Sequence, residues 1–171
     1  MEPILIEDVR KFEDNRGFFY ESYKQSMINE SFVQDNHSLS KKNTIRGLHY
    51  QWDKPMGKLV RVAQGEIMDV VTDVRKDSGN FGKSYYYQLS DKNLKQLFVP
   101  PGFAHGFICR SETAIVLYKC TSEYNKFGES GINPFDEDLN IDWGIKLEES
   151  VISQKDLESK SFSEYILKPK F

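Results

Sequence analysis

Short apolar runs separated by turn residues occupy most of this 171-residue chain. The runs are rich in Val, Ile, Phe and Tyr, which at these lengths favours β-strands over helices. The pattern predicts strands over residues 3–7, 17–23, 44–51, 58–64, 66–74, 83–89, 95–99, 105–110 and 113–121. Only residues 23–30 and 147–160 are typical of helices.

Turn-forming residues divide these runs at short intervals. Gly, Pro, Asn and Ser gather at 15–17, 55–57, 65, 78–80 and 100–102. Such spacing is typical of a sandwich or barrel of antiparallel strands. No repeat, low-complexity segment or linker interrupts the pattern, so we expect one all-β domain over residues 1–171.

The composition describes a packed globular protein, because 13% of the residues are aromatic and the charged residues are of mixed sign. A net charge of -3 gives no general reason to bind nucleic acid, so any anionic ligand must be held by a local cluster. No apolar run approaches the roughly 20 residues that cross a bilayer. Cys109 and Cys120 lack a pairing motif, which predicts free thiols and a cytoplasmic protein.

The chain has only three histidines, His37, His49 and His105, and they lie far apart. A β-barrel metal site usually has a closely spaced pair of ligands on one strand, and the segment LHYQ around His49 lacks the second one. A site with three or four ligands would consume every histidine. We therefore expect no metal ion, while a buried structural role stays open for each histidine.

Several groups suited to proton transfer lie around His49. A neutral imidazole can accept a proton, a tyrosine such as Tyr118 can donate one, and Lys58 or Arg46 can stabilise an oxyanion. These are the parts for enolisation beside a carbonyl group. Strict alternation, however, would put Arg46 and His49 on opposite faces of one strand. Either the strand ends or bulges between them, or one of the two lies outside the site.

Lys58 shares a predicted strand face with Val60 and Val62. One interpretation is an edge-strand lysine whose ammonium stays in water. The other is a lysine that points into the mouth of a barrel, where it would hold negative charge.

Eight segments occur in a recognisable order: RGFFYES, QDNHSLSKKNTIRGLHYQ, GKLVRVAQGEIMDVVTDVRKDS, GKSYYYQLS, FVPPGFAHGF, LYKCTSEYNKFGESGI, IDWGI and SQKD. Together they span nearly the whole chain, which resembles the dTDP-4-dehydrorhamnose 3,5-epimerase family of nucleotide-sugar enzymes. The resemblance implies a cupin-type jelly-roll barrel of antiparallel strands with few short helices. It also implies a homodimer with neither a metal nor an organic cofactor.

The reaction implied by this resemblance inverts carbons 3 and 5 of a nucleoside diphosphate 4-keto-6-deoxy sugar, with dTDP as the expected nucleotide. By the motif match, His49 removes each proton to give an enolate, and Asp156 hydrogen-bonds the imidazole. Lys58 stabilises the enolate oxygen. Tyr118 returns a proton from the opposite face of the sugar ring.

Substrate-binding positions also follow from the match. They are Arg16, Glu21, Gln34, Asn36, Arg46, His105, Tyr124, Glu129 and Lys155. Arg46 is suited to bidentate phosphate contacts, and Tyr124 matches the aromatic residue that stacks on the nucleobase. In this family the N-terminal segment commonly completes the neighbouring subunit's site, so dimerisation would be part of function.

Other interpretations remain open at this point. Tyr118 and Tyr124 could be half-buried strand residues, Asp156 could decorate a charged C-terminal segment, and Arg16 could be an ordinary turn residue. Glu123 stands where many family members carry an aromatic residue, which leaves the nucleobase open. Alternative functions are epimerisation at one carbon only, a CDP- or GDP-linked substrate, a 3,4-ketoisomerase, a non-catalytic sugar-nucleotide-binding barrel and a metal-dependent dioxygenase.

Overall fold

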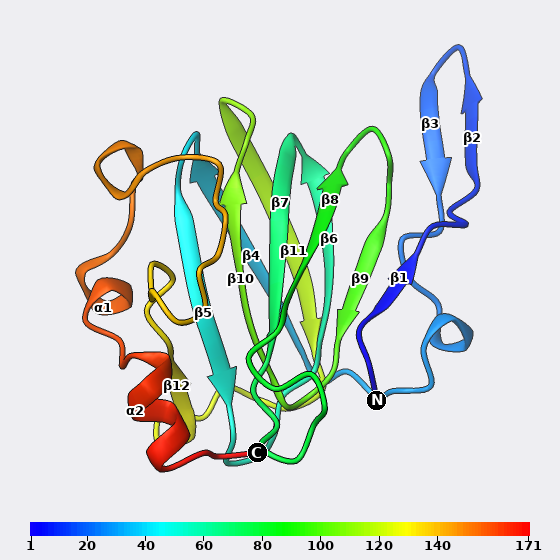
Figure 1. Ribbon diagram of the computed structural model, residues 1–171. Helices are drawn as coiled ribbons and strands as arrows, with labels where there is room; N and C mark the ends of the chain where they lie inside the picture. The colour runs from blue at the N-terminus through cyan, green and yellow to red at the C-terminus, as the bar shows by residue number, and fades with distance from the viewer.

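The computed structural model describes residues 1–171 and is built around two five-stranded antiparallel sheets (Figure 1). In spatial order the first sheet contains β1 (Ile4–Ile6), β9 (Gln96–Val99), β6 (Lys58–Gln64), β11 (Thr113–Cys120) and β4 (Gln34–Lys41). The second contains β12 (Glu129–Gly131), β5 (Ile45–Gln51), β10 (Phe103–Cys109), β7 (Glu66–Asp73) and β8 (Ser84–Ser90). The predicted all-β antiparallel fold is therefore confirmed.

Alternation along β7 explains how one strand serves two cores. Val71 belongs to a cluster of twelve buried residues contributed by both sheets, including Val60 of β6 and Phe107 of β10. Its neighbour Val70 points the other way, into a second cluster of twelve that includes Trp143. Because both faces of β7 are covered, apolar residues occur on each of them. Complete burial of each such side chain stabilises the fold by roughly 1.5–3 kcal/mol.

The C-terminal segment covers the second cluster. Two short helices, α1 (Gln154–Leu157) and α2 (Phe162–Leu167), lie beside β5 and β12 at the left of Figure 1. Phe162 and Tyr165 of α2 are buried in the cluster, and the Tyr165 hydroxyl donates a hydrogen bond to the Val74 carbonyl (2.7 Å). This packing holds α1, which directly precedes α2 in the chain, against the end of the second sheet. No helix of the protein is long and apolar enough to span a membrane.

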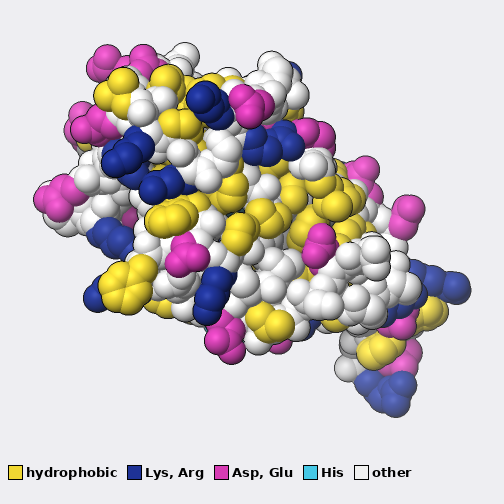
Figure 2. Space-filling model, turned by 90° about the horizontal axis from the view of Figure 1, so that it is seen from below, with side chains coloured by type: hydrophobic (Ala, Val, Ile, Leu, Met, Phe, Trp, Pro, Cys, Tyr) yellow, Lys and Arg dark blue, Asp and Glu magenta, His cyan; other side chains and the backbone are white.

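A two-stranded hairpin, β2 (Lys11–Asp14) and β3 (Gly17–Tyr20), projects from the sandwich at the upper right of Figure 1. It pairs with neither large sheet. All three of its phenylalanines, Phe12, Phe18 and Phe19, are exposed. On the face seen from below, hydrophobic side chains gather in the middle, with positive and negative side chains interspersed around them (Figure 2).

The helix predictions are only partly correct. Residues 23–30 form no α-helix but a single 3-10 turn, η1 (Gln25–Met27), because Ile28 is drawn into a small cluster with Leu59 and Phe98. Residues 147–160 divide into η2 (Leu147–Glu149) and α1. Between them Val151 runs extended and forms a bridge with Thr44, which ends the first turn. A helix this short gains little from propagation, so tertiary contacts decide where it ends.

Candidate active site

A cavity of about 800 Å³ opens at the end of the sandwich where β4, β5 and α1 approach one another. Every predicted site residue lines it except Arg16 and Glu21. The lining members of the predicted set are His49, Tyr118, Asp156, Lys58, Gln34, Asn36, Arg46, His105, Tyr124, Glu129 and Lys155. They come from six strands, one loop and one helix, so the fold gathers residues that are scattered along the chain.

A bulge in β5 resolves the conflict between Arg46 and His49. His49 lies opposite His105 of β10, whereas Arg46 lies opposite Phe107, so β5 contains one residue more than β10 between these pairs. The extra residue turns Arg46 and His49 toward the same cavity. Gly47, at φ 124°, permits the close approach, because a Cβ atom there would lie 2.5 Å from the Gly106 Cα.

His49 and Asp156 form a dyad. The His49 Nε2 lies 2.7 Å from the Asp156 Oδ1, and the Asp156 side chain is only 6% exposed. Burial acts to raise the pKa of Asp156, but the hydrogen bond and charge of His49, with hydrogen bonds from Gly47 and Ser153, outweigh burial and lower it. The ionised carboxylate accepts the Nε2 proton of a neutral imidazole, which leaves Nδ1 as a proton acceptor.

Ser153 fixes the helix that carries this carboxylate. It is the N-cap of α1, and its Oγ accepts a hydrogen bond from the Asp156 amide (3.1 Å). The Gly47 amide donates to the Asp156 Oδ2 (3.4 Å), which ties the helix to the bulge in β5. Sequence analysis did not single out Ser153, although a serine before a helical segment is a usual cap signal.

Lys58 faces the cavity from β6, which lies inside its sheet between β9 and β11. The edge-strand interpretation is therefore wrong, and the barrel-mouth interpretation matches the position. Burial lowers the pKa of Lys58. The carboxylates of Asp69 and Glu129 oppose that effect, as does Cys120 where its thiol is ionised. A partly desolvated ammonium here would interact strongly with a negatively charged oxygen.

Tyr118 of β11 is partly buried against the inter-sheet core and also lines the cavity. Burial and the charges of Cys120 and Glu129 raise the pKa of its phenol, against the charge of Arg46. The phenol is thus protonated at neutral pH and can act as an acid. Its half-buried strand position, the plainer interpretation, is compatible with that role.

Three predicted residues form a network at the rim of the cavity. Glu129 Oε2 accepts hydrogen bonds from the Tyr124 hydroxyl (3.0 Å) and from the Lys155 ammonium (2.8 Å). Burial acts to raise the pKa of Glu129, but these two bonds outweigh it and lower the pKa. Tyr124 lies in the loop after β11, is 55% exposed, and its amide donates to the Gln34 Oε1. Its ring is available to stack on a planar ligand.

Arg46 and His105 are each held by a buried residue. The Arg46 Nε donates to the Ser40 Oγ (3.0 Å), and the His105 Nε2 lies 2.9 Å from the Asp69 Oδ2. Sequence analysis missed Ser40 and Asp69. The signal for Asp69 was a lone carboxylate between apolar residues in the run EIMDVV, where an unpaired charge would be costly.

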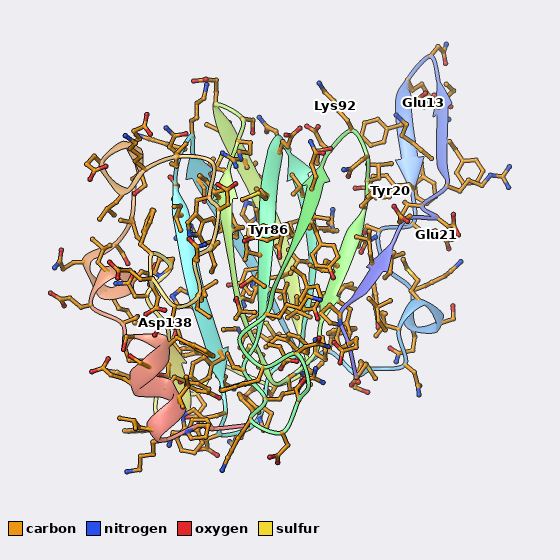
Figure 3. All side chains as sticks on the ribbon, viewed as in Figure 1. Glu13, Tyr20, Glu21, Tyr86, Lys92 and Asp138 are labelled. Carbon is orange, nitrogen blue, oxygen red and sulfur yellow. The ribbon has the colours of Figure 1, made fainter.

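Arg16 and Glu21 lie away from the cavity. Arg16 is on the hairpin, where its side chain is 85% exposed and pairs with Asp14. Glu21 pairs with Lys24 at the base of the hairpin, on the side of the molecule opposite α1 (Figure 3). Within one chain, neither residue lines the cavity beside His49.

The remaining candidate residues lie outside this site or beneath it. His37 of β4 is exposed and lines a separate cavity on the outer face of the first sheet. Both cysteines are buried and unpaired, which confirms the predicted free thiols. No group of three or more His, Cys, Asp or Glu side chains is placed to hold a metal ion. The absence of a metal from the working protein stays a prediction.

Comparison with known proteins identifies close relatives. A family model described as dTDP-4-dehydrorhamnose 3,5-epimerase matches residues 1–164. Enzymes with that name are 42% identical in Methanothermobacter thermautotrophicus (96% of this chain, 92% of the relative) and 48% identical in Salmonella typhimurium (82% and 80%).

Solved structures agree in fold. An epimerase from Legionella pneumophila in complex with dTDP-4-keto-L-rhamnose has a TM-score of 0.88 at 41% identity, covering 94% of this chain and 88% of its own. A dTDP-4-dehydrorhamnose 3,5-epimerase from Bacillus anthracis, with TDP and PPi bound, has a TM-score of 0.88 at 42% identity and 93% coverage of both chains. The likeness confirms the predicted cupin-type jelly-roll architecture.

Proposed function

Because the chain belongs to the dTDP-4-dehydrorhamnose 3,5-epimerase family, we propose that it inverts carbons 3 and 5 of a dTDP-linked 4-keto-6-deoxy sugar. Family membership makes it an isomerase. The observation that carries the proposal is the convergence of the His49–Asp156 dyad, Lys58 and Tyr118 on one cavity. A base, an oxyanion stabiliser and an acid are the groups that this reaction requires.

The chemistry follows from the ketone at carbon 4. Hydrogens on carbons 3 and 5 are acidic because the electron pair left by either one spreads onto the carbonyl oxygen. His49 takes the proton, Lys58 donates a hydrogen bond to the enolate oxygen, and Tyr118 protonates the carbon from the other face. His49 has then gained a proton and Tyr118 has lost one. Before the second inversion, His49 must release its extra proton to water and Tyr118 must take one up from water.

Binding would rest on the rest of the cavity. Arg46 and His105 offer donors for the diphosphate or sugar oxygens, which accounts for anion binding by a chain of net charge -3. Tyr124 at the rim would stack on the nucleobase. Glu129 and Lys155, with Gln34 and Asn36, would contact the sugar or the nucleoside.

A homodimer is part of the proposal. An isolated two-stranded hairpin is marginally stable in water, and this one exposes three phenylalanines. Both features are expected if the hairpin packs on a second copy and delivers Arg16 and Glu21 to that copy's cavity. Mixing an R16A variant with an H49Q variant tests this, because exchanged dimers would contain one complete site and regain activity. Mixtures with no more activity than the separate variants would contradict it.

Two further predictions made from the sequence are also part of what we propose here. One is that residues 1–171 form one domain. The other is a cytoplasmic location, which the two unpaired, buried cysteines support.

Incubation with dTDP-4-keto-6-deoxyglucose in D₂O tests the reaction. We expect deuterium at carbons 3 and 5, detected by NMR, and its loss in an H49Q variant. Label at one carbon would instead identify a mono-epimerase. Exchange only with a CDP- or GDP-linked sugar would show that the substrate carries that nucleotide and not dTDP. A ketone moved to carbon 3 would identify a ketoisomerase. Tight binding with no exchange would refute catalysis.

A further inference from the structure

A second histidine–carboxylate pair lies beside the dyad. His105 of β10 is the direct cross-strand partner of His49, so both imidazoles face the same cavity from adjacent strands. The His105 Nε2 lies 2.9 Å from the Asp69 Oδ2. The pair is deeply buried, with 8% of the His105 side chain and none of Asp69 exposed to solvent.

Asp69 is an unfavourable residue for the core in which it lies. Its Oδ1 has no hydrogen-bond partner, and its neighbours along β7 are Met68 and Val70. Burial of a carboxylate with an unsatisfied oxygen is costly, and an apolar residue of similar size would pack here more favourably. The position therefore has a role other than stability.

Lys58 is the other incompletely compensated charge in this region. The groups that act electrostatically on Lys58 are Cys120 (β11), Asp69 (β7) and Glu129 (β12). The other titratable groups that line the same cavity include His49 (β5), His105 (β10), Tyr118 (β11), Tyr124 and Asp156.

Most of these groups cannot balance the ammonium of Lys58. Burial raises the pKa of the Cys120 thiol, so the thiol is neutral near pH 7. Glu129 already pairs with Lys155. Of the two carboxylates that act on the charge of Lys58, Asp69 is the one that has no lysine or arginine partner.

We propose that Asp69 is a positioning residue of the epimerase reaction, which orients His105 toward the substrate and keeps Lys58 charged beneath the enolate oxygen. Because Asp69 accepts the Nε2 proton of His105, Nδ1 is the ring nitrogen left for the substrate. The negative charge on β7 also favours the ammonium form of Lys58 against its burial. This inference rests on the proposed function and adds a residue to it.

The test is an Asp69→Asn variant, with Asp73→Asn as its matched control. Asp73 lies on the same strand and is also fully buried, but it pairs with Arg75 and does not line the cavity. In D69N we expect kcat to fall roughly 10- to 100-fold, as when residues that orient a functional histidine are removed. KM should change less, because Lys58 meets full negative charge only after enolisation.

The pH profile separates this role from a structural one. Without the charge of Asp69, Lys58 loses its proton at lower pH, so the alkaline limb of kcat/KM should move down by about half a pH unit or more. D73N should lower the melting temperature and leave the profile in place. A folded D69N protein with the wild-type profile and kcat within about twofold would overturn the inference.

A measurement on the wild-type protein decides the matter if D69N does not fold. The chain has three histidines, so ¹⁵N-histidine labelling gives three ring systems, and an H105Q variant assigns one of them. We expect His105 to carry its proton on Nε2, and an unprotonated Nε2 would refute the pairing. Absence of turnover by the wild-type enzyme would instead defeat the proposed function, whatever the tautomer of His105.

Discussion

Replacing Asp156 by asparagine would remove the charge behind the proposed base without changing the shape of the side chain. The His49 Nε2 lies 2.7 Å from this carboxylate, which is 6% exposed, so water can replace it only poorly. A hydrogen bond to a charged group contributes roughly 1.5–3 kcal/mol. Proton abstraction turns His49 into an imidazolium, and the carboxylate stabilises this ion more than the neutral ring. At about 1.4 kcal/mol per tenfold in rate, kcat should fall by roughly 10- to 150-fold.

The assay follows deuterium incorporation at carbons 3 and 5 by NMR at saturating substrate. An H49Q variant gives the lowest rate expected in this assay, since loss of a general base typically lowers the rate roughly 10²- to 10⁴-fold. Asp138→Asn is the control for charge, because Asp138 is exposed, lies near α2 and does not line the cavity (Figure 3). If D156N exchanges both carbons within about threefold of the wild-type and D138N rates, the dyad is not the base, and the proposed mechanism is refuted.

Three further outcomes are expected. Tyr118→Phe should slow product formation roughly 10²- to 10⁴-fold while deuterium exchange with retention continues, and equal loss of both would contradict its role as the acid. Burial acts to raise the pKa of Asp73, but its hydrogen bonds to Arg75 outweigh burial and lower the pKa. This carboxylate therefore stabilises the fold above about pH 4, and the stabilisation is lost as the pH falls through the pKa of Asp73 in the folded protein. In a plot of melting temperature against pH, D73N should therefore have a shallower slope on the acid side than the wild type. An unchanged slope would contradict this. Gly47→Ala, which places a methyl group against Gly106, should lower the unfolding free energy in urea by about 3 kcal/mol, and a loss below about 1 kcal/mol would contradict the crowding at the bulge.

Local patterns in the sequence were enough to predict most of the strands. The strand predictions at 58–64 and 113–121 agree with β6 and β11 to within one residue, because alternating apolar positions reflect burial on one face. The strand β4, with the sequence QDNHSLSK, was missed. Its side chains are largely polar, and it exists because its backbone pairs with β11 along its whole length.

The motifs in their order were enough to indicate the family, and most of the residues that they predicted for the site line one cavity. The tertiary structure decided which of them meet. Asp156 reaches His49 across 107 positions of sequence, and Arg46 joins it only because β5 bulges at Gly47. Arg16, by contrast, is carried away from the cavity on the hairpin.

There is a physical reason why the sequence determined the strands and the tertiary structure determined which residues meet. Side-chain periodicity records whether each position is buried, which is a local property that a single sequence displays. Strand register, a bulge, or a carboxylate such as Asp69 beneath His105 depends on which distant segments pack together. Those contacts arise from backbone hydrogen bonding and close packing between elements, and no local pattern encodes them.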